Sequence, residues 1–555
     1  MNNSKNHSIF YLALAGVIAL GFMLRFWHLD IKPLWLDEVL TGFLSLGRPY
    51  ADVPLDTLFP ISTLPQLLRL QPNLSCPEIA QAVASQSTHP PLFFCLMHQW
   101  LNWTEPLTQP LNWKLRALPA LFGVMAIASI YLLNRLAFSK TAGLMGAAFM
   151  AVSPFAVYLS QEARHYTLPM LLVTLALLGL IQIQYNIYSQ RQLPKPVIWV
   201  LWGVVNSIGC YVHYFFILAF LAQLLTLIGI MYWRRRFIPK GSWLSVTFVI
   251  IGVAVSYLPW IPVLLGGFGR SETGWLPKPE HIAPLYQTLA GWLSIVIVLP
   301  VESQPLWVQI PMVLLTIGFG GWIGWQAFVG IKQLWRSPEI HIATLTLLCF
   351  IACCLLEFAG IIYLLGKDIT VAPRYNFIYF PAICALLGAS LSCAKGRMGR
   401  FRKFLPLFLA FLSSIFVVFN LAFQKPFNPQ QVARNMKFER DVPVMMVVGY
   451  NSFQDVALGL SFALAIDKLN LDISKSKASD SVAFLYTKQG YELVWQKLSK
   501  LSALIAPRLH LWVVAPGLRR KDYPQQLVLA PKKSCSIDPT QHYRIGIPYQ
   551  LYRCK

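Results

Sequence analysis

The chain has 555 residues and a net charge of +23; 56% of its residues are hydrophobic and only 12% are charged. Soluble globular proteins carry about 25% charged residues, so this composition excludes an ordinary soluble protein and predicts a polytopic membrane protein. Much of the basic charge lies in short loops between apolar runs, where the positive-inside rule explains it. The positive charge therefore does not predict a nucleic-acid partner.

Apolar runs of roughly 17–25 residues are long enough to cross a bilayer as helices. We expect about eleven spans, near residues 8–26, 116–136, 142–160, 167–188, 196–211, 214–232, 242–265, 306–330, 341–365, 374–393 and 404–423. The apolar run over 284–300 is interrupted, and we expect it to lie at the membrane interface.

The distribution of charge predicts the orientation of the chain. With a cytoplasmic N-terminus, the inside loops hold basic runs such as Arg234-Arg235-Arg236 and the Lys and Arg residues of 395–403. Most acidic residues before 425 then fall on the outer side. We expect a multi-pass protein of the plasma or inner membrane whose polar chemistry faces outward.

The first outer loop, over residues 27–115, is too long for a bare connection and should contain interfacial helices. It carries the acid pair Asp37-Glu38 beside Trp27 and Trp35. Such a pair is either a solvated loop start or, at a membrane boundary, a base and charge-stabilising group for a lipid-borne substrate. In the same loop, His89-Pro-Pro starts an apolar stretch that ends in an aromatic tail at Trp103. His89 there either binds substrate or holds the fold of the loop.

Three further polar clusters face outward. Glu162, Arg164 and Tyr166 lie between the third and fourth predicted spans, where the first two either pair with each other or take part in a site. Arg374, followed by Tyr375, enters the tenth span and is either a snorkelling anchor or a bidentate ligand for a lipid phosphate. His213 lies in an aromatic turn that an interfacial belt would also explain.

Glu357 lies within the ninth predicted span, where a carboxylate is a candidate functional group, but the sequence assigns it no role. A second outer loop over 266–305 carries Arg270 and Glu272.

After about residue 425 the hydrophobic density falls. Strand-like runs at 442–449 and 509–515 alternate with amphipathic helical stretches near 455–467 and 488–503, which predicts a small extracytoplasmic α/β domain. We therefore expect a membrane domain over 1–424 and this outer domain over 425–555. In an oxidising compartment, Cys535 and Cys554 are the better candidates for a disulfide, and Cys76 and Cys95 the weaker ones.

Several of these motifs, in this order, resemble the GT-C superfamily of integral-membrane glycosyltransferases, in particular the protein O-mannosyltransferase and lipid A aminoarabinose transferase branch. The resemblance covers residues 10–395 and rests on Leu34-Trp-Leu-Asp-Glu38, His89-Pro-Pro, Leu115-Arg-Ala-Leu-Pro, Ala151-Val-Ser-Pro-Phe, Glu162-Ala-Arg-His-Tyr166, Leu258-Pro-Trp-Ile-Pro262 and Pro373-Arg-Tyr375. It implies an all-α polytopic membrane core that transfers a sugar, with inversion, from a polyprenyl-phosphate donor to a lipid, glycan or protein acceptor.

In residue terms, the resemblance implies that Asp37 is the base, with Glu38 as its neighbour and Glu162 assisting the positioning of acceptor or donor. Arg374 would bind the donor phosphate, with Arg164 as the second choice. We also expect His89, Tyr166, His213 and Tyr375 to bind substrate. Some members of the superfamily use a divalent metal and others need no cofactor, and this sequence leaves metal dependence open.

Two other classes of protein compete with this interpretation. A transporter or lipid flippase would show related halves or several mid-membrane charges, and apart from Glu357 the sequence shows neither. A membrane anchor for the outer domain would not need polar clusters on several outer loops.

Overall fold

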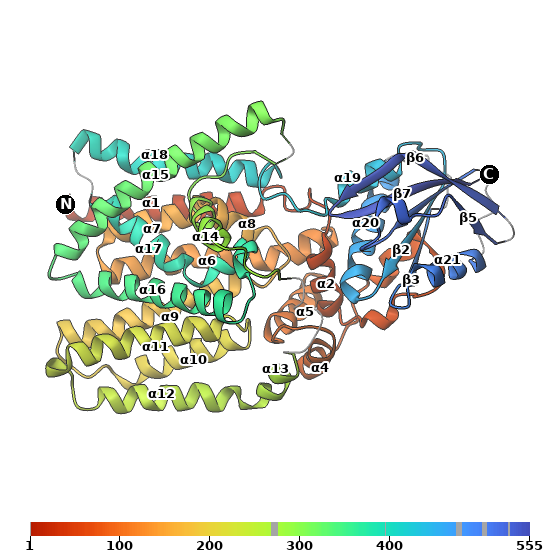
Figure 1. The fold of residues 1–555 in the computed structure, drawn as a ribbon. Coiled ribbons are helices and arrows are strands. Elements are labelled where there is room, and N and C mark those ends of the chain that lie inside the picture. The colour runs from red at the N-terminus through yellow and green to blue at the C-terminus, as the bar shows by residue number, and fades with distance from the viewer. Residues whose placement is uncertain are drawn as a thin grey trace. The chain divides into compact units, whose positions relative to one another are not determined.

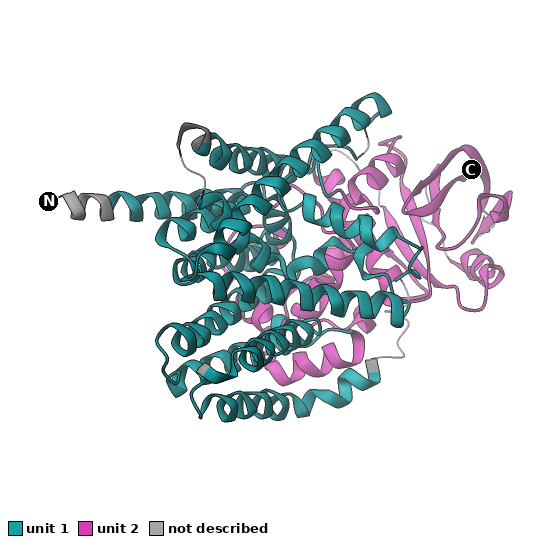
Figure 2. Ribbon diagram, turned by 60° about the vertical axis from the view of Figure 1, so that its left-hand side comes forward, with its two compact units in different colours: residues 1–29, 88–93, 113–423 teal, residues 30–87, 94–112, 424–555 magenta. Residues whose placement is uncertain are grey.

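The computed structural model describes residues 2–267, 276–302, 304–393, 396–472, 480–501, 508–530 and 533–554. Arg270 and Glu272 of the second outer loop lie outside these residues. The chain forms two compact units, each built from more than one segment (Figure 2). We call them the membrane unit, residues 1–29, 88–93 and 113–423, and the sheet unit, residues 30–87, 94–112 and 424–555.

The membrane unit is helical, as the sequence predicts (Figure 1). In the described chain, eight helical stretches are long and apolar enough to cross a membrane. They are formed by α1 (Asn2–Phe26), α6 (Leu111–Ala137), α9 (Thr167–Gln184) with a π turn (Tyr185–Ser189), α11 (Phe216–Trp233), α12 (Ser242–Tyr257) with α13 (Ile261–Gly267), α15 (Leu306–Arg336), α16 (His341–Leu364) and α18 (Gly396–Val418).

The remaining predicted spans coincide with shorter or bent elements. α7 (Lys140–Val152) and α8 (Pro154–Ser160) form a pair bent by 57°, and α10 (Pro196–Cys210) and α17 (Phe380–Ser392) are shorter apolar helices. The stretch predicted to be interfacial contains the short helix α14 (Ala283–Leu293). Every predicted apolar segment is therefore helical, whereas the exact number of spans stays a prediction.

Small residues allow close helix packing inside the membrane unit. A Cβ atom on Gly388 of α17 would lie 2.5 Å from the Cα of Gly146 of α7, so both positions need glycine. Next to this contact, the Asn134 side chain of α6 donates hydrogen bonds to the carbonyl oxygens of Ala142 (3.2 Å) and Ala385 (3.0 Å). One amide thus connects three helices where the bilayer offers no water.

The bend between α7 and α8 depends on Arg25, near the end of α1. Pro154 follows the end of α7 and has no backbone N–H, so the carbonyl groups of the last α7 turn lose helical partners. The buried Arg25 guanidinium donates to the carbonyl oxygens of Met150 (2.9 Å) and Ala151 (3.0 Å) and to Ser160 Oγ (3.1 Å). These bonds replace the missing helical ones and connect both arms of the bend to α1.

The sheet unit confirms the predicted α/β domain. Its seven strands lie in the order β1-β3-β2-β4-β7-β6-β5. They are β1 (Leu58–Pro60), β2 (Val444–Tyr450), β3 (Ser481–Tyr486), β4 (Leu509–Val514), β5 (Gln526–Leu529), β6 (Lys533–Ile545) and β7 (Ile547–Cys554). β2 pairs in parallel with β3 and β4, and the other neighbours are antiparallel. The unit also contains α19 (Pro429–Met436), α20 (Phe453–Asp472) and α21 (Tyr491–Lys500).

Most of the first outer loop belongs to this sheet unit, although its sequence position suggests the membrane domain. Besides β1, it forms α2 (Leu36–Ser45), α3 (Leu64–Leu67), α4 (Cys76–Gln86) and α5 (Leu92–Thr104). Leu58 of β1 pairs with Ala483 of β3, and Tyr50 stacks on Phe453 of α20 with ring centroids 4.6 Å apart. The loop therefore supplies an edge strand and part of the core of the unit that the C-terminal residues complete.

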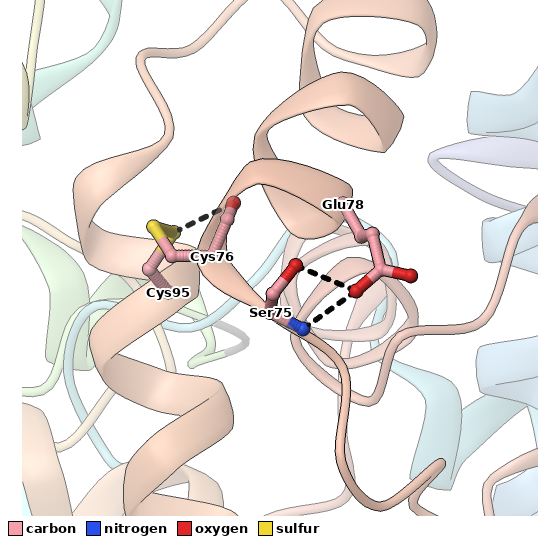
Figure 3. Close-up of a disulfide and its surroundings, with 4 residues drawn as sticks. All are labelled: Ser75, Cys76, Glu78 and Cys95. Carbon is pink, nitrogen blue, oxygen red and sulfur yellow. Dashed lines mark hydrogen bonds between the residues drawn. A yellow bond between two sulfur atoms is a disulfide. The ribbon is translucent and has the colours of Figure 1, made fainter.

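Both candidate disulfides are formed, and both lie in the sheet unit. Cys76–Cys95 joins α4 to α5, next to Ser75, whose backbone N–H and hydroxyl donate to Glu78 at the start of α4 (Figure 3). Cys535 and Cys554 face each other across β6 and β7. The six free cysteines of the described chain all lie in the membrane unit.

Removal of the Arg25 guanidinium should destabilise the membrane unit. Because Arg25→Met leaves buried carbonyl groups without donors, we expect a loss of about 1–3 kcal/mol in unfolding free energy. Thermal unfolding of the purified protein in detergent would measure this loss. Arg135→Met, at an exposed position on α6, is the matched control and should have little effect. Equal melting temperatures for the two variants would contradict the role given to Arg25.

Candidate functional site

Four connections of the membrane unit bring polar side chains together. They are the turn 88–91 before α5, the loop 161–166 between α8 and α9, the turn 211–215 between α10 and α11, and the 3-10 segment Pro373–Ile378 before α17. Each lies directly outside a helix end, where the backbone can turn and polar side chains are not forced into lipid. The six residues that the sequence predicts as ligand-binding lie on these connections: His89, Arg164, Tyr166, His213, Arg374 and Tyr375.

Three histidines form the centre of the cluster. The ring centroid of His165 lies 4.8 Å from that of His89 and 4.8 Å from that of His213, and the other two are 6.3 Å apart. His213 Nδ1 accepts a hydrogen bond from the backbone N–H of Phe215 at 2.9 Å, which fixes the orientation of its ring. Phe93 covers His165 from one side at 5.9 Å.

Two arginines share one aromatic ring beside these histidines. The Cζ atoms of Arg164 and Arg374 lie 5.7 and 5.9 Å from the centroid of the buried Tyr166 ring. Arg374 also lies 5.8 Å from the Tyr375 ring. The guanidinium group of Arg164 is 3.4 Å from His89 Nε2. Cation–π contacts with these rings contribute to the position of both guanidinium groups, and their N–H groups suit phosphate or carboxylate oxygens.

The histidines are neutral beside these two cations. Burial, together with the charges of Arg164 and Arg374, lowers the pKa of His89 to about 3. Burial and the same arginines also hold the pKa values of His165 and His213 well below the usual value for histidine. The cluster therefore combines two fixed positive charges with three uncharged imidazoles, which is an arrangement that favours an anion.

The predicted carboxylates lie in two places. Glu162 is buried in the same loop as Arg164, whose backbone N–H donates to the Glu162 carbonyl oxygen at 2.7 Å. Asp37 and Glu38 belong to the sheet unit, in the first turn of α2. The buried Glu38 carboxylate accepts a hydrogen bond from the Trp35 backbone N–H at 3.3 Å, so it caps this helix. Asp37 is only partly buried.

His165 is the member of the cluster that the sequence does not single out. Its side chain is fully buried, and neither ring nitrogen has a hydrogen-bond partner among the described residues. The sequence places it between Arg164 and Tyr166, but only the turn of the loop shows that it points toward the other two histidines. A buried, unpartnered imidazole is costly, so a water molecule or a ligand is expected to complete its hydrogen bonds.

Two further groups bear on the site differently. Within the described chain, no group of at least three His, Cys, Asp or Glu side chains is arranged to hold a metal ion, and metal dependence stays a question for experiment.

Glu357 lies in α16, and its carboxylate oxygens have no hydrogen-bond partner among the described residues. The structure gives it no role.

The chain is similar to known glycosyltransferases in sequence and in fold. A sequence model of the family described as dolichyl-phosphate-mannose-protein mannosyltransferase matches residues 88–260, which include three of the four connections that form the cluster. A search of curated proteins found no match.

Two solved structures cover nearly all of the chain. ArnT from Cupriavidus metallidurans bound to undecaprenyl phosphate is 10% identical, with a TM-score of 0.53 over 98% of this chain and 97% of that one. The apo form of the same protein gives 0.51 at 10% identity, over 99% and 98%. The archaeal oligosaccharyltransferase AglB from Archaeoglobus fulgidus is 15% identical, with a TM-score of 0.44 over 83% of this chain and 64% of that one.

The chain has an ArnT-like fold, with a helical membrane unit and a sheet unit that the C-terminal residues complete. The family match and this fold confirm the predicted resemblance to the GT-C superfamily of integral-membrane glycosyltransferases.

The neutral histidines should make the protein sensitive to acid. Below pH 6.5 the unfolded chain binds a proton that folded His89 does not bind, so stability falls as the pH decreases from 6.5 toward 3. The loss amounts to at most about 1.4 kcal/mol per pH unit for one histidine. Between pH 7.5 and pH 5, the melting temperature of His89→Asn should therefore decrease less than that of the wild type. His341→Asn, at the start of α16, is the control. Identical pH dependence of the wild type and His89→Asn would contradict the prediction.

Proposed function

We propose that the protein transfers a sugar from a polyprenyl-phosphate-linked donor to an acceptor on the outer face of the membrane. The observation that carries this proposal is the pair of arginines, Arg164 and Arg374, held on Tyr166 at the ends of apolar helices. An amphiphilic donor needs its phosphate bound beside a hydrophobic region, and this arrangement supplies the cationic part. The ArnT structure of the same fold is described as bound to undecaprenyl phosphate, which supports the donor class.

In this proposal Arg374 binds the donor phosphate and Arg164 assists it. A guanidinium group offers two parallel N–H donors to phosphate oxygens, and Arg374 lies in cation–π contact with Tyr166 and Tyr375. The same two charges stabilise the negative charge that develops on the leaving phosphate as the glycosidic bond breaks. His89 and His213 are uncharged at neutral pH, so they can serve as hydrogen-bonding groups for the donor.

The chemical step needs a base for the acceptor as well. Asp37 removes the acceptor proton, the acceptor oxygen bonds to the anomeric carbon, and the bond from that carbon to the phosphate oxygen breaks with its electron pair. One displacement of this kind inverts the anomeric configuration. Glu38 is the poorer candidate base because its carboxylate caps α2. Glu162 is proposed to position acceptor or donor.

The distribution of cysteines supports an outward-facing sheet unit. Both disulfides belong to that unit, whereas the free cysteines of the described residues belong to the membrane unit. Disulfides persist in oxidising compartments outside the cytosol. We therefore propose that the sheet unit lies on the outer side and that the N-terminus is cytoplasmic. The acceptor, whether lipid, glycan or protein, would receive the sugar on that outer side.

Asp37→Asn should abolish sugar transfer while leaving the protein folded, because the amide cannot accept the acceptor proton. We expect a decrease in turnover of at least about 100-fold, within the range for loss of a general base. The measurement is sugar transfer or release by purified protein in lipid, with a panel of polyprenyl-phosphate sugars. Asp52→Asn, which removes the ion pair with Arg48 in the same unit, is the matched control. Undiminished turnover by Asp37→Asn would place the base elsewhere.

Arg374→Ala should weaken donor binding more than Arg374→Lys, because lysine retains the charge but lacks the bidentate geometry. We expect at least about a tenfold increase in the apparent donor dissociation constant for the alanine variant, since hydrogen bonds to charged groups contribute about 1.5–3 kcal/mol. Arg336→Ala, exposed at the end of α15, serves as control.

An unchanged donor affinity in Arg374→Ala would make this arginine an interfacial anchor. Movement of intact lipid-linked sugar across the bilayer, without bond cleavage, would favour the transporter alternative over the enzyme.

A further inference from the structure

His165 is the most enclosed polar side chain of the arginine–histidine cluster. It is fully buried, and both ring nitrogens lack hydrogen-bond partners among the described residues. Its ring lies against His89 and His213 at 4.8 Å each and against Tyr166 at 4.4 Å. A ligand that reaches this ring would meet an imidazole whose hydrogen-bonding capacity the described residues do not use.

The charged and titratable groups that act on His165 come from all four connections of the cluster. They are His89, His213, Arg164 and Arg374, and none of them is acidic. Burial and these groups hold the pKa of His165 well below its usual value when no ligand is bound. An anion in contact with the imidazole would act in the opposite direction, because an opposite charge and a hydrogen bond to the charged form both favour protonation.

The reaction proposed above changes the charge in this site. A polyprenyl-phosphate sugar is a phosphodiester with one negative charge. Its product, a polyprenyl monophosphate, carries a charge of about −1.5 to −2 at pH 7, because the second pKa of a phosphate monoester is about 6. The guanidinium groups of Arg164 and Arg374 cannot compensate for this additional negative charge, because their own charge is fixed.

We propose that His165 contacts the phosphate and takes up one proton from solvent when a polyprenyl monophosphate occupies the site. This inference rests on the proposed function and adds a charge-compensating residue to it. The acceptor proton still goes to Asp37, and the electron pair of the broken bond stays on the phosphate oxygen. The proton on His165 comes from water and returns to water when the lipid phosphate leaves.

The proposal has a defined pH dependence. The bound phosphate raises the pKa of His165 above its value without the ligand. Between these two pKa values, affinity for the monophosphate decreases by up to tenfold for each unit of increasing pH. The titration of the phosphate itself acts in the opposite sense near pH 6, so the decrease should be sought between pH 7 and 9.

The test is isothermal titration calorimetry of the full chain in nanodiscs with farnesyl phosphate. Titration at pH 7.5 in two buffers of different ionisation enthalpy gives the number of protons bound. We expect the wild type to take up about one proton with farnesyl phosphate and markedly less with its methyl diester. His165→Asn, which can donate a hydrogen bond but cannot be protonated in this range, should bind more weakly, without uptake and with a flat affinity between pH 7 and 9. His341→Asn should behave as the wild type.

The outcomes separate this inference from the proposed function. Binding of farnesyl phosphate with equal proton uptake in the wild type and His165→Asn would overturn the role of His165 and leave the donor site standing. No binding by the wild type would overturn both. If His165→Asn does not fold, the comparison of monoester and diester in the wild type still decides, because equal proton uptake with both would overturn the inference.

Discussion

The membrane unit depends on one hydrogen-bonding constraint at a broken helix. Between α7 and α8 the backbone bends, and in a bilayer no water replaces the carbonyl partners lost there. Arg25 supplies donors to Met150, Ala151 and Ser160, and the Ser414 hydroxyl donates to the carbonyl oxygen of Val152 at 2.7 Å. The loop that carries Arg164 and His165 follows α8, the second arm of this bend. Arg25, which is not itself part of the cluster, therefore stabilises the helix that positions this loop.

The cluster is unusual in its buried histidine. A buried histidine normally has its ring nitrogens hydrogen-bonded. His165 has no hydrogen-bond partner for either ring nitrogen in the described chain, and Arg164 and Arg374 lie 5.7 and 5.9 Å from the Tyr166 ring beside it. An unpartnered buried imidazole costs stability. A ligand that hydrogen-bonds to His165 would remove that cost.

The sequence predicts most of this architecture because membrane helices carry a strong local signal. Every predicted apolar segment is helical, and His89, Arg164, His213 and Arg374 lie where helix ends would expose them. The seven-stranded sheet is predictable only in part, since β1 contains three residues and pairs with a strand more than 400 residues away. The capping role of Glu38 is a local contact with Trp35, three residues earlier, whereas the inward direction of His165 depends on tertiary geometry, which residue types and spacing do not encode.

The interleaved sheet unit has a consequence for how the protein is made. β1 emerges from the ribosome roughly 20–80 seconds before its partner β3, at translation rates of about 5–20 residues per second. During that interval an unpaired edge strand is exposed to other chains. The Cys76–Cys95 bridge lies entirely within the early segment, so it can hold α4 and α5 together before the C-terminal residues arrive. Separate expression of residues 425–555 would lack that edge strand and the α2 helix.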